Sequence, residues 1–141
     1  MEQEVCYINL LKEENFERQL INLTRKYEGK KIVLYGAGMF FKIICQNYDL
    51  TGLNIVAISD KKYMDVETPS FDSELGYNVI SPLFINSLKP DIVFLTVAEE
   101  FFIEKFFHEE LFKDKTRKFK YKMLFQKSLA RKIHEEFMKR V

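Results

Sequence analysis

The chain has 141 residues, of which 47% are hydrophobic and 14 are Phe, and its formal net charge is +1. This length and apolar content exclude a disordered chain and favour a single domain over residues 1–141. The sequence has no apolar run long enough to cross a membrane, and its acidic start, Met1-Glu2-Gln3-Glu4, is unlike a secretory signal. We therefore expect a cytoplasmic protein in which Cys6 and Cys45 stay reduced.

The charge is divided unevenly along the chain. Residues 1–112 carry 11 Lys and Arg against 18 Asp and Glu, a net of −7, whereas residues 113–141 carry 11 against 3, a net of +8. In one interpretation the basic end meets an acidic partner, a membrane surface or nucleic acid. In the other it complements the acidic body of its own or a neighbouring subunit.

The predicted elements begin with a helix and then alternate between strands and helices. Apolar residues three to four apart predict a helix over 13–28, within an N-terminal addition of residues 1–29. Short apolar runs predict strands over 31–35, 54–59, 77–80, 91–97 and 119–125. The helices predicted between and after them cover 39–48, 82–89, 99–112 and 126–141. Residues 61–75 have no helical period and are predicted to form a long loop.

This alternation is typical of a parallel sheet that is covered on both faces. With right-handed crossovers the five strands take the order 3-2-1-4-5, numbered along the chain. The expected fold class is therefore α/β. We predict a Rossmann-like three-layer core over residues 30–125 with a parallel five-stranded sheet and extra N- and C-terminal helices, the last over 126–141.

The turn after the first strand is the centre of the functional interpretation. An apolar strand ends in Gly36-Ala37-Gly38, and a helix begins at Met39, as at the start of a dinucleotide-binding unit. The first Gly permits the tight turn, and the second lets a pyrophosphate approach the backbone. The start of the helix directs its N–H groups at the phosphate. The full dinucleotide-binding fingerprint has a third Gly three residues after the second. Phe41 occupies that position here, which argues against a standard NAD dehydrogenase site.

Polar residues end neighbouring strands at the same edge of the predicted sheet. Asp60 stands where an acid holds ribose hydroxyls, although it could equally cap the following loop, and Lys61 beside it suits a phosphate. Thr96 and Val97 end the fourth strand, across the crevice in which open α/β sheets bind ligands. The predicted binding residues are Gly36, Ala37, Gly38, Met39, Asp60, Lys61, Thr96 and Val97.

The sequence contains no complete catalytic constellation, so we expect a binding module in preference to an enzyme. No Ser stands in a Gly-x-Ser-x-Gly setting, and no plausible helix carries a Tyr-x-x-x-Lys pair. His108 and His134 have no metal-ligand spacing, and we interpret them as structural and surface residues. Residues 118–122 alternate basic and aromatic side chains, which we interpret as an edge strand and not as a nucleic-acid stripe.

Four segments carry a resemblance to a known family: 32–38, 56–60, 76–82 and 91–94. They resemble the Rossmann-like nucleotide- or nucleotide-sugar-binding domains of bacterial surface-polysaccharide biosynthesis enzymes. Such domains precede the β-helix of sugar acyltransferases or are attached to sugar methyltransferases and glycosyltransferases. The resemblance covers about residues 30–125 and implies that part of a nucleotide sugar binds at the Gly-rich turn. Phe40 and Phe41 replace the usual continuation of that turn, and the β-helix that carries acyl transfer is missing.

Three functions remain open from the sequence. The first is a nucleotide or nucleotide-sugar binding module in surface-glycan biosynthesis, with catalysis supplied by a partner enzyme. The second is an NAD(P)-dependent oxidoreductase that acts on a sugar nucleotide, and the third is a ligand-free scaffold for protein contacts.

The final helix adds a prediction about assembly. Its apolar stripe predicts a homodimer through the terminal helices, unless the helix packs back on its own sheet. The stripe consists of Leu129, Ile133, Phe137 and Val141.

Overall fold

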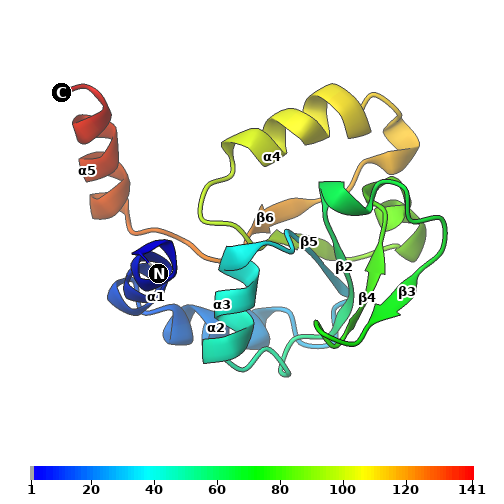
Figure 1. Ribbon diagram of the computed structural model, residues 1–141, viewed down its shortest axis with the longest axis horizontal. Helices are drawn as coiled ribbons and strands as arrows, with labels where there is room; N and C mark the ends of the chain where they lie inside the picture. Colours follow the sequence, from blue (N-terminus) through cyan, green and yellow to red (C-terminus); the bar gives the residue numbers. More distant parts are fainter. Residues whose placement is uncertain (1) are drawn as a thin grey trace.

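The computed structural model describes residues 2–141 and has a mixed α/β fold with one central sheet (Figure 1). Met1, the first residue of the acidic start, lies outside the described residues. Six strands form the sheet in the order β3-β4-β2-β1-β5-β6. The predicted five-stranded sheet with the order 3-2-1-4-5 is therefore wrong in strand number and does not describe the whole order.

The difference lies at one edge of the sheet. Five strands run parallel to one another: β1 (Ile32–Tyr35), β2 (Ile55–Ser59), β4 (Tyr77–Ile80), β5 (Ile92–Leu95) and β6 (Tyr121–Met123). The sixth, β3 (Ser70–Asp72), pairs antiparallel with β4 inside the segment predicted as a loop. Three residues are too few to show an alternating pattern. The strand exists because a turn at Gly76, with φ of 79°, folds it back against β4.

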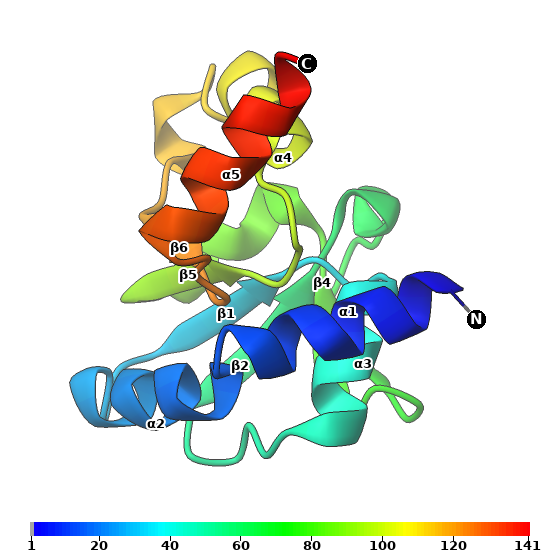
Figure 2. The same ribbon diagram turned by 90° about the vertical axis from the view of Figure 1, so that its left-hand side faces the viewer.

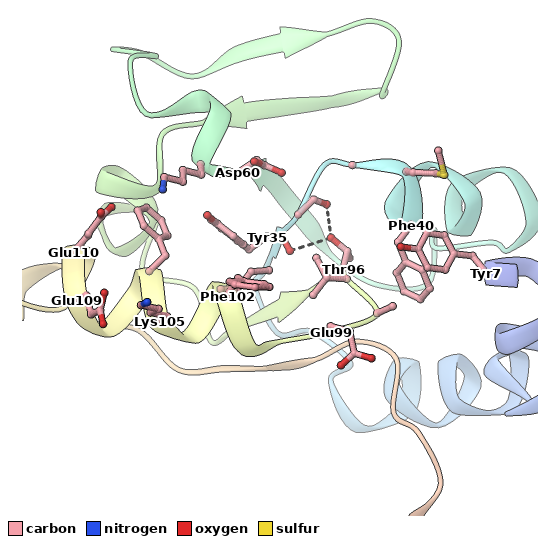
Figure 3. A pocket seen from close by; sticks show the side chains of 18 residues that line it. Tyr7, Tyr35, Phe40, Asp60, Thr96, Glu99, Phe102, Lys105, Glu109 and Glu110 are labelled. Carbon is pink, nitrogen blue, oxygen red and sulfur yellow. Dashed lines mark hydrogen bonds between the residues drawn. The ribbon is translucent and has the colours of Figure 1, made fainter. Parts of the chain in front are cut away.

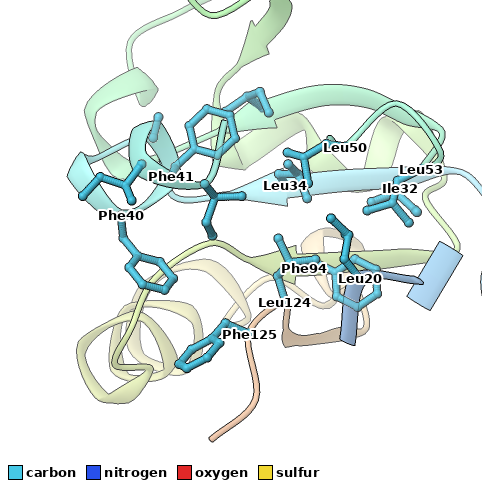
Figure 4. Close-up of a cluster of buried hydrophobic side chains, with 14 of the residues drawn as sticks. Leu20, Ile32, Leu34, Phe40, Phe41, Leu50, Leu53, Phe94, Leu124 and Phe125 are labelled. Carbon is cyan, nitrogen blue, oxygen red and sulfur yellow. The ribbon is translucent and has the colours of Figure 1, made fainter. Parts of the chain in front are cut away.

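Helices α1 (Glu2–Glu13), α2 (Phe16–Lys26) and α3 (Met39–Asn47) cover one face of the sheet. The helix predicted over 13–28 is observed as α2, and α1 is a further helix in the N-terminal addition. Asn15 has a φ of 51°, and its side chain accepts a hydrogen bond from the backbone N–H of Arg18 at 3.4 Å, which begins α2. The cluster beneath these helices joins Leu20 and Phe41 to the β1 side chains of Ile32 and Leu34 (Figure 4).

The opposite face is covered by α4 (Phe101–Phe106), its π-helical continuation η3 (Phe107–Leu111) and the 3₁₀ helix η2 (Pro82–Leu88). Phe107 is fully buried and makes edge contacts with the rings of Tyr35 and Phe119. Successive residues of β1 point to opposite faces, so Val33 and Tyr35 belong to this second cluster. The shorter 3₁₀ turns are η1 (Lys61–Tyr63) and η4 (Lys115–Arg117).

The last helix, α5 (Leu129–Lys139), stands apart from the sheet, and none of its residues is buried (Figures 1 and 2). It is held at its start by polar contacts. The Nε of Arg131 lies 2.6 Å from the Glu14 carboxylate, which also accepts hydrogen bonds from the N–H and hydroxyl of Ser128. The alternative in which this helix packs back on its own sheet is therefore wrong. Within residues 2–141, no helix is both long and apolar enough to cross a membrane.

We expect the attachment of α5 to weaken as the pH falls below the usual Glu14 pKa of 4.5. Burial raises the pKa of Glu14, but the hydrogen bonds from Ser128 and Arg131 outweigh it, so the pKa lies below its usual value. A lowered pKa gives stability that is present above 4.5 and is lost as the folded carboxylate becomes protonated. Hydrogen exchange of residues 128–139, measured relative to the intrinsic exchange rate at each pH, should accelerate between neutral and acidic pH. In a Glu14→Gln variant it should be fast already at neutral pH, and slow exchange there would contradict this role.

Candidate functional site

A crevice of about 640 Å³ opens at the carboxyl ends of β1 and β5 (Figure 3). Tyr35, Gly36 and Thr96 form its floor. The start of α3 lines one wall together with Tyr7 of α1, whose ring meets that of Phe40 edge-on at 5.0 Å. Helix α4 and η3 line the other wall. The crevice therefore lies between two helices that cover opposite faces of the sheet.

Gly36 brings the end of β1 against the end of β5. Its φ is +117°, and a Cβ built there would lie 2.9 Å from the hydroxyl oxygen and 3.1 Å from the carbonyl oxygen of Thr96. The Thr96 hydroxyl is directed at the carbonyl oxygens of Tyr35, at 3.0 Å, and of Gly36. Packing within the protein thus accounts for this glycine, and the Thr96 side chain is occupied by backbone groups.

Asp60 holds the middle of the same turn. One carboxylate oxygen accepts the N–H of Ala37 at 2.7 Å, and the other accepts the N–H of Lys62 at 3.1 Å. The ammonium group of Lys62 in turn donates to the carbonyl of Ala37 at 2.9 Å. The loop-capping interpretation of Asp60 therefore holds, and the same carboxylate fixes the Gly-rich turn.

Gly38 is different, because neither a positive φ nor a close contact requires a glycine there. It has a φ of −93°, and a Cβ built on it meets no described atom within 4 Å. It precedes the first turn of α3, whose N–H groups have no acceptor within the helix, and no side chain caps them. The start of α3 therefore presents open space, free amides and the positive end of the helix dipole to the crevice.

The wall formed by α4 and η3 combines aromatic and charged groups. Phe102 is 78% exposed at the rim, and the ammonium group of Lys61 lies 5.0 Å from the centre of the Phe106 ring. Figure 3 shows Lys105, Glu109 and Glu110 along the same wall, facing Asp60. The wall thus offers rings for stacking, ammonium groups for an anion and carboxylates for hydroxyl groups.

The hydroxyl groups near this edge serve the fold. Ser59 donates to the carbonyl of Ile80 at 2.8 Å, and Ser81 donates to that of Met64 at 3.1 Å. Burial, together with the Asp60 carboxylate, raises the pKa of Tyr35, so its hydroxyl stays protonated at neutral pH. Among residues 2–141, no group of His, Cys, Asp and Glu is arranged to hold a metal ion.

The structure brings seven of the eight predicted binding residues to one crevice: Gly36, Gly38, Met39, Asp60, Lys61, Thr96 and Val97. Ala37 is fully buried and takes part only through its backbone. The sequence analysis missed Tyr7, Phe102 and Lys105. No local signal identifies them, because α1 lies outside the predicted core and the α4 pattern shows only which residues face the sheet.

We expect two alanine substitutions in the turn to have opposite outcomes. Gly36→Ala should lower the free energy of unfolding by about 2 kcal/mol or more, because it combines a strained positive φ with the Thr96 contact. Gly38→Ala should cost less than about 1 kcal/mol, the range of a lost glycine N-cap. Urea unfolding of both variants measures this difference, and equal losses would show that the turn does not constrain the two glycines differently.

No protein-family model, no curated protein and no solved structure matches this chain. The resemblance of the four segments described above therefore stays a prediction. The function has to be argued from the chemistry of the crevice, and the residues that the fold leaves unoccupied carry that argument.

Proposed function

We propose that this chain is a Rossmann-like module that binds a nucleotide, and that a nucleotide sugar is its ligand. The observation that carries the proposal is the contrast between the two glycines of the turn. Packing requires Gly36, whereas Gly38 faces open space beside the free amides of α3. A glycine that the fold does not need is accounted for when a phosphate approaches the backbone at that point.

The walls of the crevice suit the remaining parts of such a ligand. A diphosphate at the start of α3 would meet N–H groups and the helix dipole. A base can stack on Phe102 or on the Tyr7–Phe40 pair, since aromatic rings accept bases of any sequence. Sugar hydroxyls can donate to Glu109 or Glu110. A nucleotide sugar carries these three chemistries in one molecule.

The two alternative functions have less support. A ligand-free scaffold would leave Gly38 unexplained, and Phe41 does not block the crevice, because it is fully buried in the cluster beneath α3. An NAD(P)-dependent oxidoreductase would need an acid for ribose recognition and a proton donor. Asp60 is occupied by two backbone N–H groups, and Tyr35 is almost wholly buried. We therefore propose a binding role, with catalysis in surface-glycan assembly supplied by a partner enzyme.

A panel of nucleotides tests the proposal. Thermal unfolding should be measured with millimolar NAD(H), NADP(H), coenzyme A and UDP-, GDP- and CDP-sugars. At least one nucleotide sugar should raise the unfolding temperature, because a ligand that binds only the folded state stabilises it. If none of these compounds shifts the unfolding temperature, the proposal fails.

The variant Gly38→Val locates the ligand. Its branched side chain fills the open space beside α3, so it should weaken binding of the active nucleotide by roughly tenfold or more while the ligand-free protein still unfolds cooperatively. Asn78→Val, at an exposed position of β4 outside the crevice, is the matched control and should bind normally. Unchanged affinity in Gly38→Val would place the ligand elsewhere.

A further inference from the structure

Both walls of the crevice are bonded to one short segment, residues 127–131, that leads into α5. One wall contains Tyr7 of α1, and the other is formed by α4 and η3, whereas residues 127–131 do not line the crevice. The segment starts from a fixed point. The backbone N–H of Gln126 donates to the side chain of Gln19 on α2, and the Gln19 amide donates back to the Gln126 carbonyl, each at 2.8 Å.

On one side the segment holds the end of α1. The Nε of Arg131 lies 2.6 Å from the Glu14 carboxylate, and a second guanidinium nitrogen donates to Glu13. The N–H and the hydroxyl of Ser128 donate to the same Glu14 oxygen, each at 3.2 Å. The Glu14 side chain is only 10% exposed, so these donors fix it in place. They therefore fix the end of the helix that carries Tyr7.

On the other side the segment holds the approach to α4. The ammonium group of Lys127 donates to Glu99 at 2.5 Å and to Glu135 of α5 at 2.9 Å. The Lys127 side chain is only 9% exposed, and a charge removed from water in this way needs its partners. Glu99 lines the crevice just before α4, and in the view of Figure 3 it lies between Phe102 and Phe40.

Helix α5 can leave this position without opening the core. None of its residues is buried, and its apolar stripe faces outward, where the homodimer predicted through the terminal helices stays a prediction. Release of the helix therefore costs only polar contacts, which water can replace. An element held in this way exchanges between an attached and a released position more readily than a helix with an apolar side in the core.

We propose that residues 127–131 are a strap that sets the width of the crevice, and that release of α5 widens the crevice and weakens nucleotide binding. The effect on binding rests on the proposed function, whereas the strap depends only on contacts of the ligand-free chain. Arg131 holds one wall and Lys127 the other, so both walls lose their common anchor when the strap is released. Because the coupling is reciprocal, a bound nucleotide must favour the attached position of α5 to the same extent.

Distances between spin labels in the ligand-free protein test the strap. One label is attached to the native Cys6 on α1 and the other to Phe101→Cys on α4, in a Cys45→Ser background. Both positions are exposed and lie outside the crevice lining. The labelled chain is diluted with unlabelled protein, so that only distances within one chain are measured. With the strap intact, the distribution of distances should be narrow.

Variants of the strap should change this distribution. Lys127→Met with Arg131→Met removes the anchors of both walls, so the distribution should broaden and shift to longer distances. Each single variant should broaden it less. Arg140→Met is the matched control, because it breaks only an ion pair to Glu136 within α5, and it should keep the native distribution. Urea unfolding checks that each variant is folded. A double variant with the native distribution would overturn the strap.

Calorimetry with UDP-glucose, GDP-mannose and CDP-glucose measures the coupling. A nucleotide sugar that binds the native chain should bind the double variant about fivefold more weakly or worse, although neither changed residue lines the crevice. It should also slow hydrogen exchange in α5 of the native chain. Unchanged affinity in the double variant would overturn the coupling. If no nucleotide binds, the proposed function and the coupling fail together, and the spin-label distances still decide whether the strap holds the walls.

Discussion

The close approach of the turn after β1 to the end of β5 is the constraint on which the crevice depends. Gly36 lies against Thr96 at a distance that leaves no room for a Cβ, and the Thr96 hydroxyl is directed at the carbonyls of that turn. Asp60, which follows the neighbouring strand β2, accepts a hydrogen bond from the backbone N–H of Ala37. With three adjacent strand ends joined in this way, the start of α3 has a single position, and its free amides face the crevice.

The crevice therefore divides into residues that build it and residues that remain available. Thr96, Asp60, Ser59 and Ser81 have their polar atoms occupied by backbone groups. The available groups are the amides of α3, exposed rings and charged side chains along α4 and η3. Such a set offers donors for a phosphate, rings for a base and carboxylates for sugar hydroxyls. This division is the basis of the binding role that we propose.

Helix α5 is also held in place by polar contacts. Its start is bonded to α1 and to the segment before α4 through Arg131 and Lys127, so its direction is set by ion pairs and not by apolar packing. Because these contacts use its polar side, its apolar side must face outward. Its outward residues add no apolar packing to either core cluster, because no residue of the helix is buried.

The sequence by itself determined the five parallel strands, the Gly-rich turn and the edge at which polar residues gather. These are local patterns: apolar runs, glycines and the residues that end strands are read within a few positions of one another. Only the tertiary structure decided that α1 supplies Tyr7 to the crevice, that β3 joins the sheet and that Asp60 bonds Ala37. It also decided that α5 faces outward. The stripe on α5 is visible in its sequence, but which side it turns to the body depends on ion pairs with residues over a hundred positions away. Such long-range contacts leave no periodic trace in a single sequence.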